Sequence, residues 1–501
     1  MRRTAALVAA LVAALPAAAQ TPFPTTPPRP GPVAALAAAL PAVAQTPFPT
    51  TPPRPGPAAP LTPPTPVVRK LANGLTVMYV RRTEVPAVNA TLVVRGAGNT
   101  DDPADLPGLA SFTASMLDEG AGGRNALQLA DALETLGANL TASSAWDATQ
   151  LNLYALRGNF PQALRLMADV VARPDFPERE VGRLREERLV ALSRSRDEAG
   201  AIANNAFPAL VYGAQHPYGR FATTEATRRL DRARVQGFHA TRYRPENSTL
   251  VLVGDVDPAA LQPVVESALG AWRASGAAAA PAASLPSPTI ARSVVYLVDK
   301  PGAAQSEIRI GHPGVARNSP DYYALQVLNT IVGGSFTSRL NTNLRETKGW
   351  SYGARSSYAM RQAAGPFTAQ AAVVTAKTDS SVVEFMRELN RIRSEPVSAE
   401  ELDKAKRYLA LGFPQTVETN PQVAGQLAGL VTYGIDPSFL SSYVQRVRAV
   451  TADDVRRVAN QYVRPDNAVI VVVGDRSQVE AGLRAVNVAP VEIRDVAEFT
   501  K

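Results

Sequence analysis

The chain has 501 residues, enough for two or three domains, and its 46% hydrophobic and 19% charged residues are typical of a globular protein. The formal net charge of +8 is modest for this length, and no Lys/Arg run with interleaved aromatic residues marks a nucleic-acid-binding surface. The sequence contains no cysteine, which excludes a disulfide framework and a lipid-modified cysteine anchor. We therefore expect no nucleic-acid partner.

The N-terminal segment has the pattern of a secretory signal peptide. Arg2 and Arg3 precede an apolar run from Ala5 to Leu15, and Ala17–Ala19 resembles a signal cleavage site. The apolar run is too short to span a bilayer as a stop-transfer helix. We therefore expect residues 1–19 to be removed, and the mature chain to be periplasmic without membrane insertion.

A Pro-rich leader, residues 20–66, follows the signal peptide and contains a duplication. The segment Ala19–Pro32 recurs letter for letter at Ala44–Pro57, with a second apolar stretch between the copies. Cleavage after Ala44 is therefore an alternative to cleavage after Ala19. Because proline disfavours both helix and sheet, we expect an extended tether here.

Strand and helix patterns begin at Val67. Asn73-Gly74 between two strand-like runs indicates a hairpin. The predicted strands are Val67–Leu71, Leu75–Val80, Val88–Val94, Gln150–Leu156 and Thr249–Gly254. The predicted helices are Leu106–Leu117, Asn125–Leu136, Phe160–Ala172, Glu178–Ser195, Arg232–Arg242 and Pro258–Trp272.

Residues 274–291 have the composition of a linker, after which a similar order of elements begins again. The predicted strands are Ser293–Val298, Ser306–Ile310, Gly353–Met360 and Gly365–Val374. The predicted helices are Tyr322–Val332, Asp379–Ile392 and Ala399–Gly412.

An internal match near the end of each half indicates a repeat. Tyr243–Asp255 parallels Val463–Asp475, and Pro245 and Pro465 are offset by 220 residues. We therefore expect two copies of one domain, at 67–273 and 292–494. Each copy mixes antiparallel-looking strands with helices grouped apart from them, which predicts an α+β fold.

Most familiar catalytic patterns are absent from the sequence. The histidines His216, His239 and His312 are scattered, so no histidine pair encodes a local zinc site. Gly333–Thr337 lacks the closing glycine of a nucleophile elbow, and Gly120–Gly123 lacks the pattern of a phosphate-binding loop. We interpret the residues around His216 as a turn.

Several segments together resemble the M16 metallopeptidase family (insulinase or pitrilysin-like), in its mitochondrial-processing-peptidase-like branch. They run across nearly all of 67–494. The matching segments are Leu71–Val77, Pro107–Ala110, His216–Arg220, Val298–Gln305, Gly333–Gly353 and the two repeated strands Tyr243–Asp255 and Val463–Asp475. The resemblance implies two tandem M16-type domains.

The zinc motif that this resemblance implies is replaced. The family has His-x-x-Glu-His on the helix after Gly-Leu-Ala, and a distal Glu completes the ligand set. Here the His positions fall on Ser111 and Ser115, the general base on Ala114 and the distal ligand on Ala191. These residues cannot reproduce the imidazole and carboxylate ligands. We therefore expect no metal and no cofactor in this chain, and no peptidase activity of the chain alone.

The substrate-binding pattern of the family is retained. In the family, an Arg and a Tyr seven residues apart on the C-terminal domain hold the substrate backbone opposite the zinc. Arg345 and Tyr352 match this pattern. An Arg fork and a Tyr hydroxyl can both donate to a peptide carbonyl or an oxyanion.

The resemblance therefore implies a non-catalytic, substrate-binding subunit of a secreted heterodimeric zinc peptidase. The implied partner is an M16 subunit with an intact His-x-x-Glu-His motif and its zinc, and the implied substrates are peptides or unfolded segments. The alternative is a non-enzymatic scaffold or peptide-binding protein with the same fold.

Overall fold

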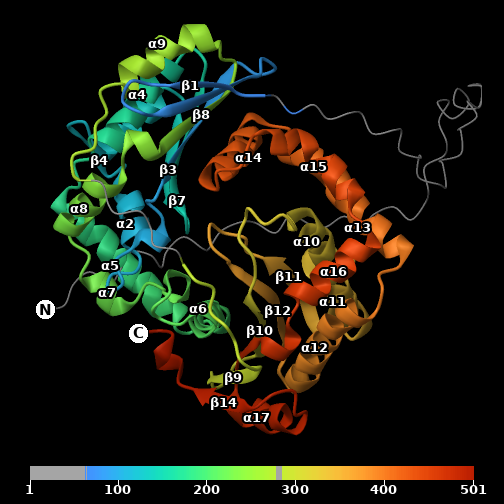
Figure 1. The fold of residues 1–501 in the computed structure, drawn as a ribbon. Helices are drawn as coiled ribbons and strands as arrows, with labels where there is room; N and C mark the ends of the chain where they lie inside the picture. Colours follow the sequence, from blue (N-terminus) through green and yellow to red (C-terminus); the bar gives the residue numbers. More distant parts are fainter. Residues whose placement is uncertain (1–62, 64, 278–284) are drawn as a thin grey trace, which may run out of the picture. The chain divides into compact units, whose positions relative to one another are not determined.

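Two six-stranded sheets with closely similar strand order form the framework of the described residues (Figure 1). The computed structural model describes residues 63, 65–277 and 285–501, all within one unit, 60–501. The predicted signal peptide, nearly all of the Pro-rich leader and part of the linker (278–284) lie outside the described residues. The domain boundaries at 67–273 and 292–494 remain predictions, and we call these two parts the N-terminal half and the C-terminal half.

The sheet of the N-terminal half has the order β1-β2-β8-β3-β7-β6. Only the pair β2 and β8 is parallel in this sheet. Its strands are β1 (Val67–Lys70), β2 (Thr76–Arg81), β3 (Ala87–Arg95), β6 (Asn139–Ser144), β7 (Ala148–Leu156) and β8 (Ser248–Gly254), and β4 (Gly120–Ala121) and β5 (Arg124–Asn125) form a separate ribbon. The predicted hairpin at Asn73-Gly74 is confirmed by the antiparallel pairing of β1 with β2.

The sheet of the C-terminal half has the order β11-β12-β10-β13-β9-β14. Its strands are β9 (Val294–Asp299), β10 (Gln305–Pro313), β11 (Ser351–Tyr358), β12 (Pro366–Val374), β13 (Val469–Gly474) and β14 (Val491–Arg494). The run β2-β8-β3-β7-β6 corresponds strand for strand to β9-β13-β10-β12-β11, and a single parallel pair joins its first two strands in both sheets. The predicted internal repeat is therefore confirmed at the level of the sheets.

Helices of the N-terminal half cover one face of its sheet. Their apolar side chains form one core with the inward-facing residues of β2, β3, β7 and β8. These helices are α2 (Leu109–Met116), α3 (Ala126–Thr135), α4 (Phe160–Ala172), α5 (Glu178–Ser195), α7 (Thr224–Arg228), α8 (Arg232–Arg242) and α9 (Pro258–Leu269). The remaining helix of this half, α6 (Ala199–Tyr212), belongs to a different core.

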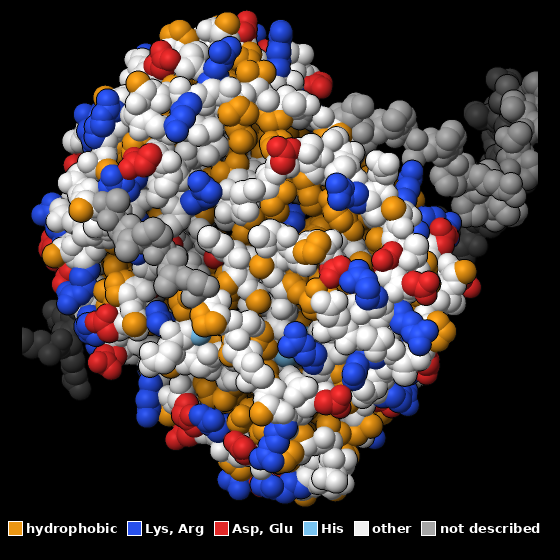
Figure 2. Space-filling model, in the orientation of Figure 1, with side chains coloured by type: hydrophobic (Ala, Val, Ile, Leu, Met, Phe, Trp, Pro, Cys, Tyr) orange, Lys and Arg blue, Asp and Glu red, His pale blue; other side chains and the backbone are white. Residues whose placement is uncertain are grey.

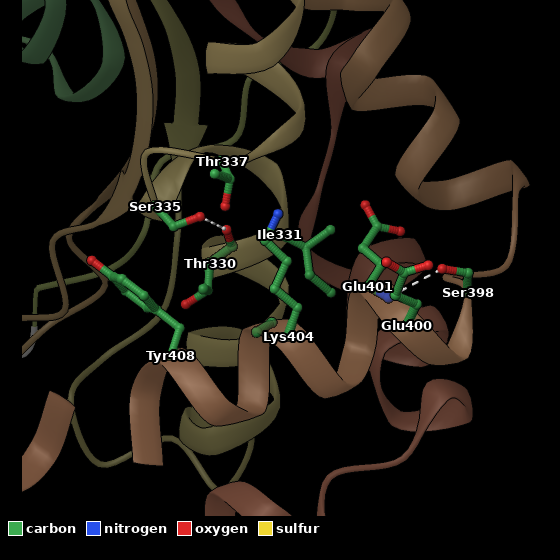
Figure 3. Close-up of a pocket in the computed structure, with 10 residues that line it drawn as sticks. Thr330, Ile331, Ser335, Thr337, Ser398, Glu400, Glu401, Lys404 and Tyr408 are labelled. Carbon is green, nitrogen blue, oxygen red and sulfur yellow. Dashed lines mark hydrogen bonds between the residues drawn. The ribbon is translucent and has the colours of Figure 1, made fainter. Parts of the chain in front are cut away.

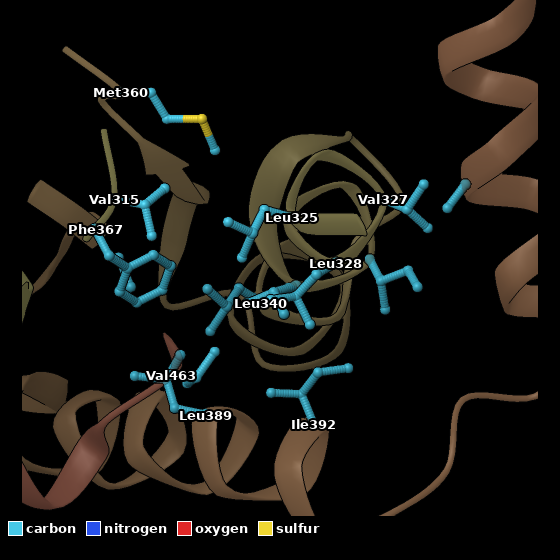
Figure 4. Close-up of a cluster of buried hydrophobic side chains, with 14 of the residues drawn as sticks. Val315, Leu325, Val327, Leu328, Leu340, Met360, Phe367, Leu389, Ile392 and Val463 are labelled. Carbon is cyan, nitrogen blue, oxygen red and sulfur yellow. The ribbon is translucent and has the colours of Figure 1, made fainter. Parts of the chain in front are cut away.

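The C-terminal half has a second, larger core. Figure 4 shows Leu325, Leu328 and Leu340 meeting Leu389 and Val463 in its centre. The helices of this half are α10 (Tyr322–Asn329), α11 (Arg339–Asn341), α12 (Thr378–Ser394), α13 (Ala399–Gly412), α14 (Asn420–Thr432), α15 (Ser438–Ala449), α16 (Ala452–Tyr462) and α17 (Arg476–Ala485).

One helix from each half packs on the sheet of the other half. Helix α6 lies against β10 and β13, and α14 lies against β3 and β8 (Figure 1). Phe207 of α6 is buried with Val471, and Leu427 of α14 is buried with Val251. Burying a side chain of this size stabilises the fold by about 1.5–3 kcal/mol, so each half depends on a helix from the other.

A hydrogen-bonded cluster also joins the halves. Asp147, in the β6–β7 turn, accepts hydrogen bonds from the Tyr218 hydroxyl (3.3 Å) and from the backbone N–H of Gln362 (3.1 Å) in the β11–β12 loop. The Arg361 guanidinium lies 4.0 Å above the Trp146 ring. Burial raises the pKa of Asp147 above its ordinary value.

The α+β prediction is confirmed, and helices α4, α5, α8 and α13 have the predicted bounds. The elements that the sequence did not predict include β6, β14, α6, α14, α15 and α17. Helix α6 contains Pro208 and is rich in small residues, so it shows little contrast between an apolar and a polar face.

The surface carries charges of both signs. On the face drawn in Figure 2, Lys and Arg side chains are interspersed with Asp and Glu side chains, with hydrophobic and uncharged side chains between them. Within the described part of the chain, no helix is both long and apolar enough to cross a membrane.

Two buried histidines each make a contribution to stability that is lost in acid. Burial lowers the pKa of His239 and of His312 from 6.5 to about 4. The His312 ring accepts from the Arg464 backbone N–H (3.1 Å) through Nε2, which requires the neutral form.

Because both folded-state pKa values lie below 6.5, the unfolded chain binds more protons between about pH 4 and 6.5. We expect the contribution of these two histidines to the free energy of unfolding to be constant above this window and to fall by up to about 3 kcal/mol per histidine on acidification through it. Asp102, whose pKa burial raises to about 7, contributes in the opposite direction, but it is present in both the unmodified chain and His312→Gln and cancels in their difference. Urea titrations at several pH values measure this. In His312→Gln the fall should be smaller, and an unchanged slope would contradict the assignment to His312.

Candidate functional site

The segment Gly333–Gly353 has an unusual backbone. Two π-helical turns, η5 (Thr330–Gly334) and η6 (Thr342–Thr347), flank the short helix α11. Turns of π-helix are uncommon and are frequently found at functional sites. Gly333 lets η5 approach β11 closely, because a Cβ there would lie 2.2 Å from the backbone nitrogen of Ser356.

Arg345 lies on η6 with its side chain 38% exposed. The guanidinium stacks over the Phe336 ring at 4.6 Å, and Nε lies 3.5 Å from a carboxylate oxygen of Glu346. Stacking fixes the plane of the guanidinium, while the exposed ion pair contributes little stability. Arg345 therefore presents oriented donors to solvent.

Tyr352 lies where β11 begins and is 91% exposed. The pairing of β11 with β12 shifts register between Ser351 and Ala354, and such a bulge redirects the side chains within it. Among the described residues, no hydrogen bond involves the Tyr352 hydroxyl. A large, exposed aromatic side chain on a bulge is free to contact a ligand.

A turn holds Arg345 and Tyr352 in one rigid element. The backbone N–H of Gly349 donates to the Arg345 carbonyl (3.0 Å), and that of Trp350 donates to the Leu344 carbonyl (2.9 Å). Gly349 has φ +65°, a conformation that favours glycine. The structure thus brings the two predicted site residues to the two ends of one hydrogen-bonded turn.

Two buried asparagines brace this turn, and the sequence analysis missed them. Asn341 donates to the Phe336 carbonyl (2.6 Å) and accepts from the Ala354 N–H (3.1 Å). Asn343 donates to Glu384 (2.8 Å) and Glu388 (2.9 Å) on α12. The segment is rich in polar residues, so the sequence does not distinguish these two amides from their neighbours, and only their burial shows that they need partners.

A cavity of about 260 Å³ lies on another side of the same segment (Figure 3). Thr330, Ser335 and Thr337 line it on one side, and the opposite wall is α13 with Glu400, Lys404 and Tyr408. The Ser335 hydroxyl donates to the Thr330 carbonyl (3.1 Å), which closes the loop beside the cavity.

The four positions of the family's zinc motif lie on α2 and α5. The Ser111 hydroxyl donates to the Gly108 carbonyl (3.0 Å) and the Ser115 hydroxyl to the Phe112 carbonyl (2.9 Å). Ala114 is 1% exposed, and Ala191 is an exposed residue of α5. The two hydroxyls are engaged with the backbone and neither alanine offers a ligand atom, so these residues do not fit a zinc ion.

The buried carboxylate next to α2 is also unavailable as a metal ligand. Asp102 accepts the backbone N–H groups of Gly108 (2.7 Å) and Ala110 (2.6 Å) and so caps this helix. Burial raises the pKa of Asp102 to about 7. Across the described ranges of the chain, no three His, Cys, Asp or Glu residues cluster in a way that could hold a metal ion.

The close contact at Gly333 yields a prediction for stability. Gly333→Ala places a methyl group against the β11 backbone, so we expect a loss of about 1–3 kcal/mol in the free energy of unfolding. Gly425→Ala in α14 is the control, because no described atom lies within 4 Å of the added Cβ and alanine favours helix. Thermal unfolding followed by calorimetry compares the two, and equal stability of both variants would contradict the steric argument.

Comparisons with known proteins show the family and the fold of the chain. The sequence model "Insulinase (Peptidase family M16)" matches residues 76–215, and "Peptidase M16 inactive domain" matches residues 229–409. An "uncharacterized zinc protease" of Mycobacterium bovis is 26% identical over 408 residues, which cover 80% of this chain and 92% of that protein. The zinc protease YmxG of Bacillus subtilis is 21% identical over 403 residues, covering 80% and 96%.

Solved structures show the same fold. A peptidase M16 inactive domain from Pseudomonas fluorescens superposes with a TM-score of 0.76 at 26% identity, covering 82% of this chain and 98% of that chain. A protease from Helicobacter pylori gives 0.76 at 21% identity, covering 82% and 100%. With two tandem domains of the M16 type and matches to both family models, the chain belongs to peptidase family M16.

Proposed function

We propose that this protein is the substrate-binding, non-catalytic subunit of a heterodimeric M16 zinc peptidase. The observation that carries the proposal is the contrast between two places in the chain. Arg345 and Tyr352 are exposed on a braced turn, whereas the positions of the zinc motif offer no metal ligand. A protein that needed only the fold has no use for an exposed, oriented Arg–Tyr pair.

In this proposal the chain binds and orients a polypeptide. The Arg345 fork donates to a substrate carbonyl oxygen, and the Tyr352 hydroxyl donates to the same oxygen or to a neighbouring carbonyl. Because the turn is fixed by backbone hydrogen bonds and by two buried asparagines, little reorganisation is needed on binding.

The partner in this proposal is an M16 subunit with an intact His-x-x-Glu-His motif. Its zinc ion would activate the attacking water, and this chain would supply Arg345 and Tyr352 to the shared site. The basic N-terminus and apolar run support export, so we place the assembly in the periplasm. The substrates are then peptides or unfolded segments of proteins.

The first test is peptide hydrolysis by the purified chain, by the partner alone, and by the two mixed. We expect no activity from this chain alone and a gain over the partner alone on mixing. Hydrolysis by this chain alone, in a preparation free of other peptidases, would overturn the non-catalytic assignment. No gain on mixing would favour a scaffold.

The second test concerns Arg345. In the assembled enzyme, we expect Arg345→Ala to lower kcat/KM by about ten- to a thousandfold, because one oriented donor to the oxyanion is lost. Subunit association, followed by size-exclusion chromatography, should not change.

Arg407→Ala is the matched control for Arg345→Ala. Arg407 is an exposed arginine of α13, with its side chain 66% accessible, and pairs with Asp403. Its removal should leave kcat/KM unchanged. Equal activity of the two variants would exclude the proposed role of Arg345.

A further inference from the structure

A guanidinium lies beside the degenerate zinc motif. Arg188 is three residues before Ala191 on α5, so both side chains lie on one side of that helix. Its Nη1 donates to the Gly108 carbonyl (2.9 Å) and to the Ser111 hydroxyl (3.2 Å). Ser111 occupies the first histidine position of the family motif, so this chain has an organic cation next to that position.

The guanidinium is held in a fixed orientation. It lies over the Phe112 ring, with 5.1 Å from the guanidinium carbon to the ring centroid. Both Nη1 contacts are to α2, so three neighbouring positions of one helix define its plane. A stacked and hydrogen-bonded guanidinium is more rigid than a surface arginine and loses less entropy on binding a further group.

Half of the guanidinium fork is unused. No hydrogen bond joins Nε or Nη2 of Arg188 to any described atom, and no carboxylate of the described residues lies within 4.0 Å of it. Neither atom is among the fully buried polar atoms that lack a partner, so neither is completely buried. The Nε–Nη2 edge of arginine is the edge that binds a carboxylate through two parallel hydrogen bonds.

The surroundings favour an anion. Burial lowers the pKa of Arg188 below its ordinary value, and the nearby Asp102 carboxylate partly opposes this effect. The two oxygens of Asp102 are occupied by the N–H groups of Gly108 and Ala110. Helix α2 packs beside β6, the edge strand of the sheet. Neither β6 (NLTASS) nor its neighbour β7 (ATQLNLYAL) carries a charged residue. Nothing on these elements would compete with a ligand for the cation or repel an anion from it.

We propose that Arg188 forms a carboxylate-binding site beside helix α2 of the N-terminal half. The ligand is a carboxylate of a bound peptide, from a Glu or Asp side chain or from the C-terminus. The proposal rests on the proposed function in that the ligand is a peptide. It would make acidic peptides the better substrates of the assembly.

The test is equilibrium binding of capped peptides to the isolated chain, measured by fluorescence anisotropy. Three peptides share an uncharged Ala/Ser sequence with one central Glu, one central Gln, or the central Gln with a free C-terminal carboxylate. We expect the Glu peptide to bind about tenfold more tightly than the capped Gln peptide, as one charge-assisted pair would give. If the free C-terminus gives the same gain, the site takes a terminal carboxylate; if only Glu does, it takes a side chain.

Arg188→Gln should abolish the preference for the carboxylate, and Arg188→Lys should retain only part of it because the fork is lost. Arg179→Gln is the control, since Arg179 lies on the same helix with its side chain 92% exposed. A purely structural role would lower the melting temperature of Arg188→Gln without changing the ratio between the two affinities. A preference that persists in Arg188→Gln, or that is absent from the unmodified chain, would overturn the proposal.

The same assay separates this inference from the proposed function. Arg345→Ala should lower the affinity for the Glu and Gln peptides equally, because Arg345 donates to the peptide backbone and does not contact the side chain that differs. Equal weakening without any effect of Arg188→Gln would leave the substrate-binding role standing and reject the carboxylate site.

Discussion

The exchange of helices between the two halves is the constraint on which the rest of the structure depends. Each apolar face of a sheet must be packed against other apolar side chains to be buried. The helices of each half cover only one face of its own sheet. Helix α14 supplies it for β3 and β8, and α6 supplies it for β10 and β13. The exchanged helices also reach β7, where Ala148 is buried with Ala428 of α14, and β12, but outward-facing residues nearer the edges, such as Thr141, Tyr154 and Arg355, stay exposed. Burial thus determines both what holds the halves together and which strands remain open to a ligand.

The open strands have a common chemistry. Strands β6, β7, β11 and β12 contain one charged residue, Arg355, and are otherwise apolar, hydroxyl-bearing or amide-bearing. Hydroxyl and amide groups can hydrogen-bond the backbone of an extended polypeptide whatever its sequence. On such a surface, any preference for particular peptide sequences depends on the few charged groups nearby. Arginines with an unoccupied pair of donors are therefore important for selectivity.

The sequence was sufficient for elements whose pattern is local. Helices α4, α5, α8 and α13 were predicted with their observed bounds because helical spacing and length agree over many residues. Asp231 and Ser398 also cap the last two of these helices. Helix α6 was missed because it is apolar on most sides and contains Pro208, features that follow from its burial against the other half. The Arg345–Tyr352 pair could be identified from its spacing in the sequence, but the residues that hold it in place could not. Asn341 and Asn343 act through β11 and α12, and only the folded chain brings these elements together.

The sequence could not identify Arg188 as a candidate site residue, because its contact with Ser111 forms only in the folded chain. Arg188 also affects whether a metal ion could bind at this position. Two positive charges a few ångströms apart repel each other strongly in a partly buried site, so a guanidinium beside Ser111 opposes a divalent cation there. Restoring histidine, glutamate, histidine and glutamate at positions 111, 114, 115 and 191 would therefore leave a group that disfavours the metal. The four replacements and Arg188 form one consistent set, in which a positive charge remains while the residues that would hold a metal are gone.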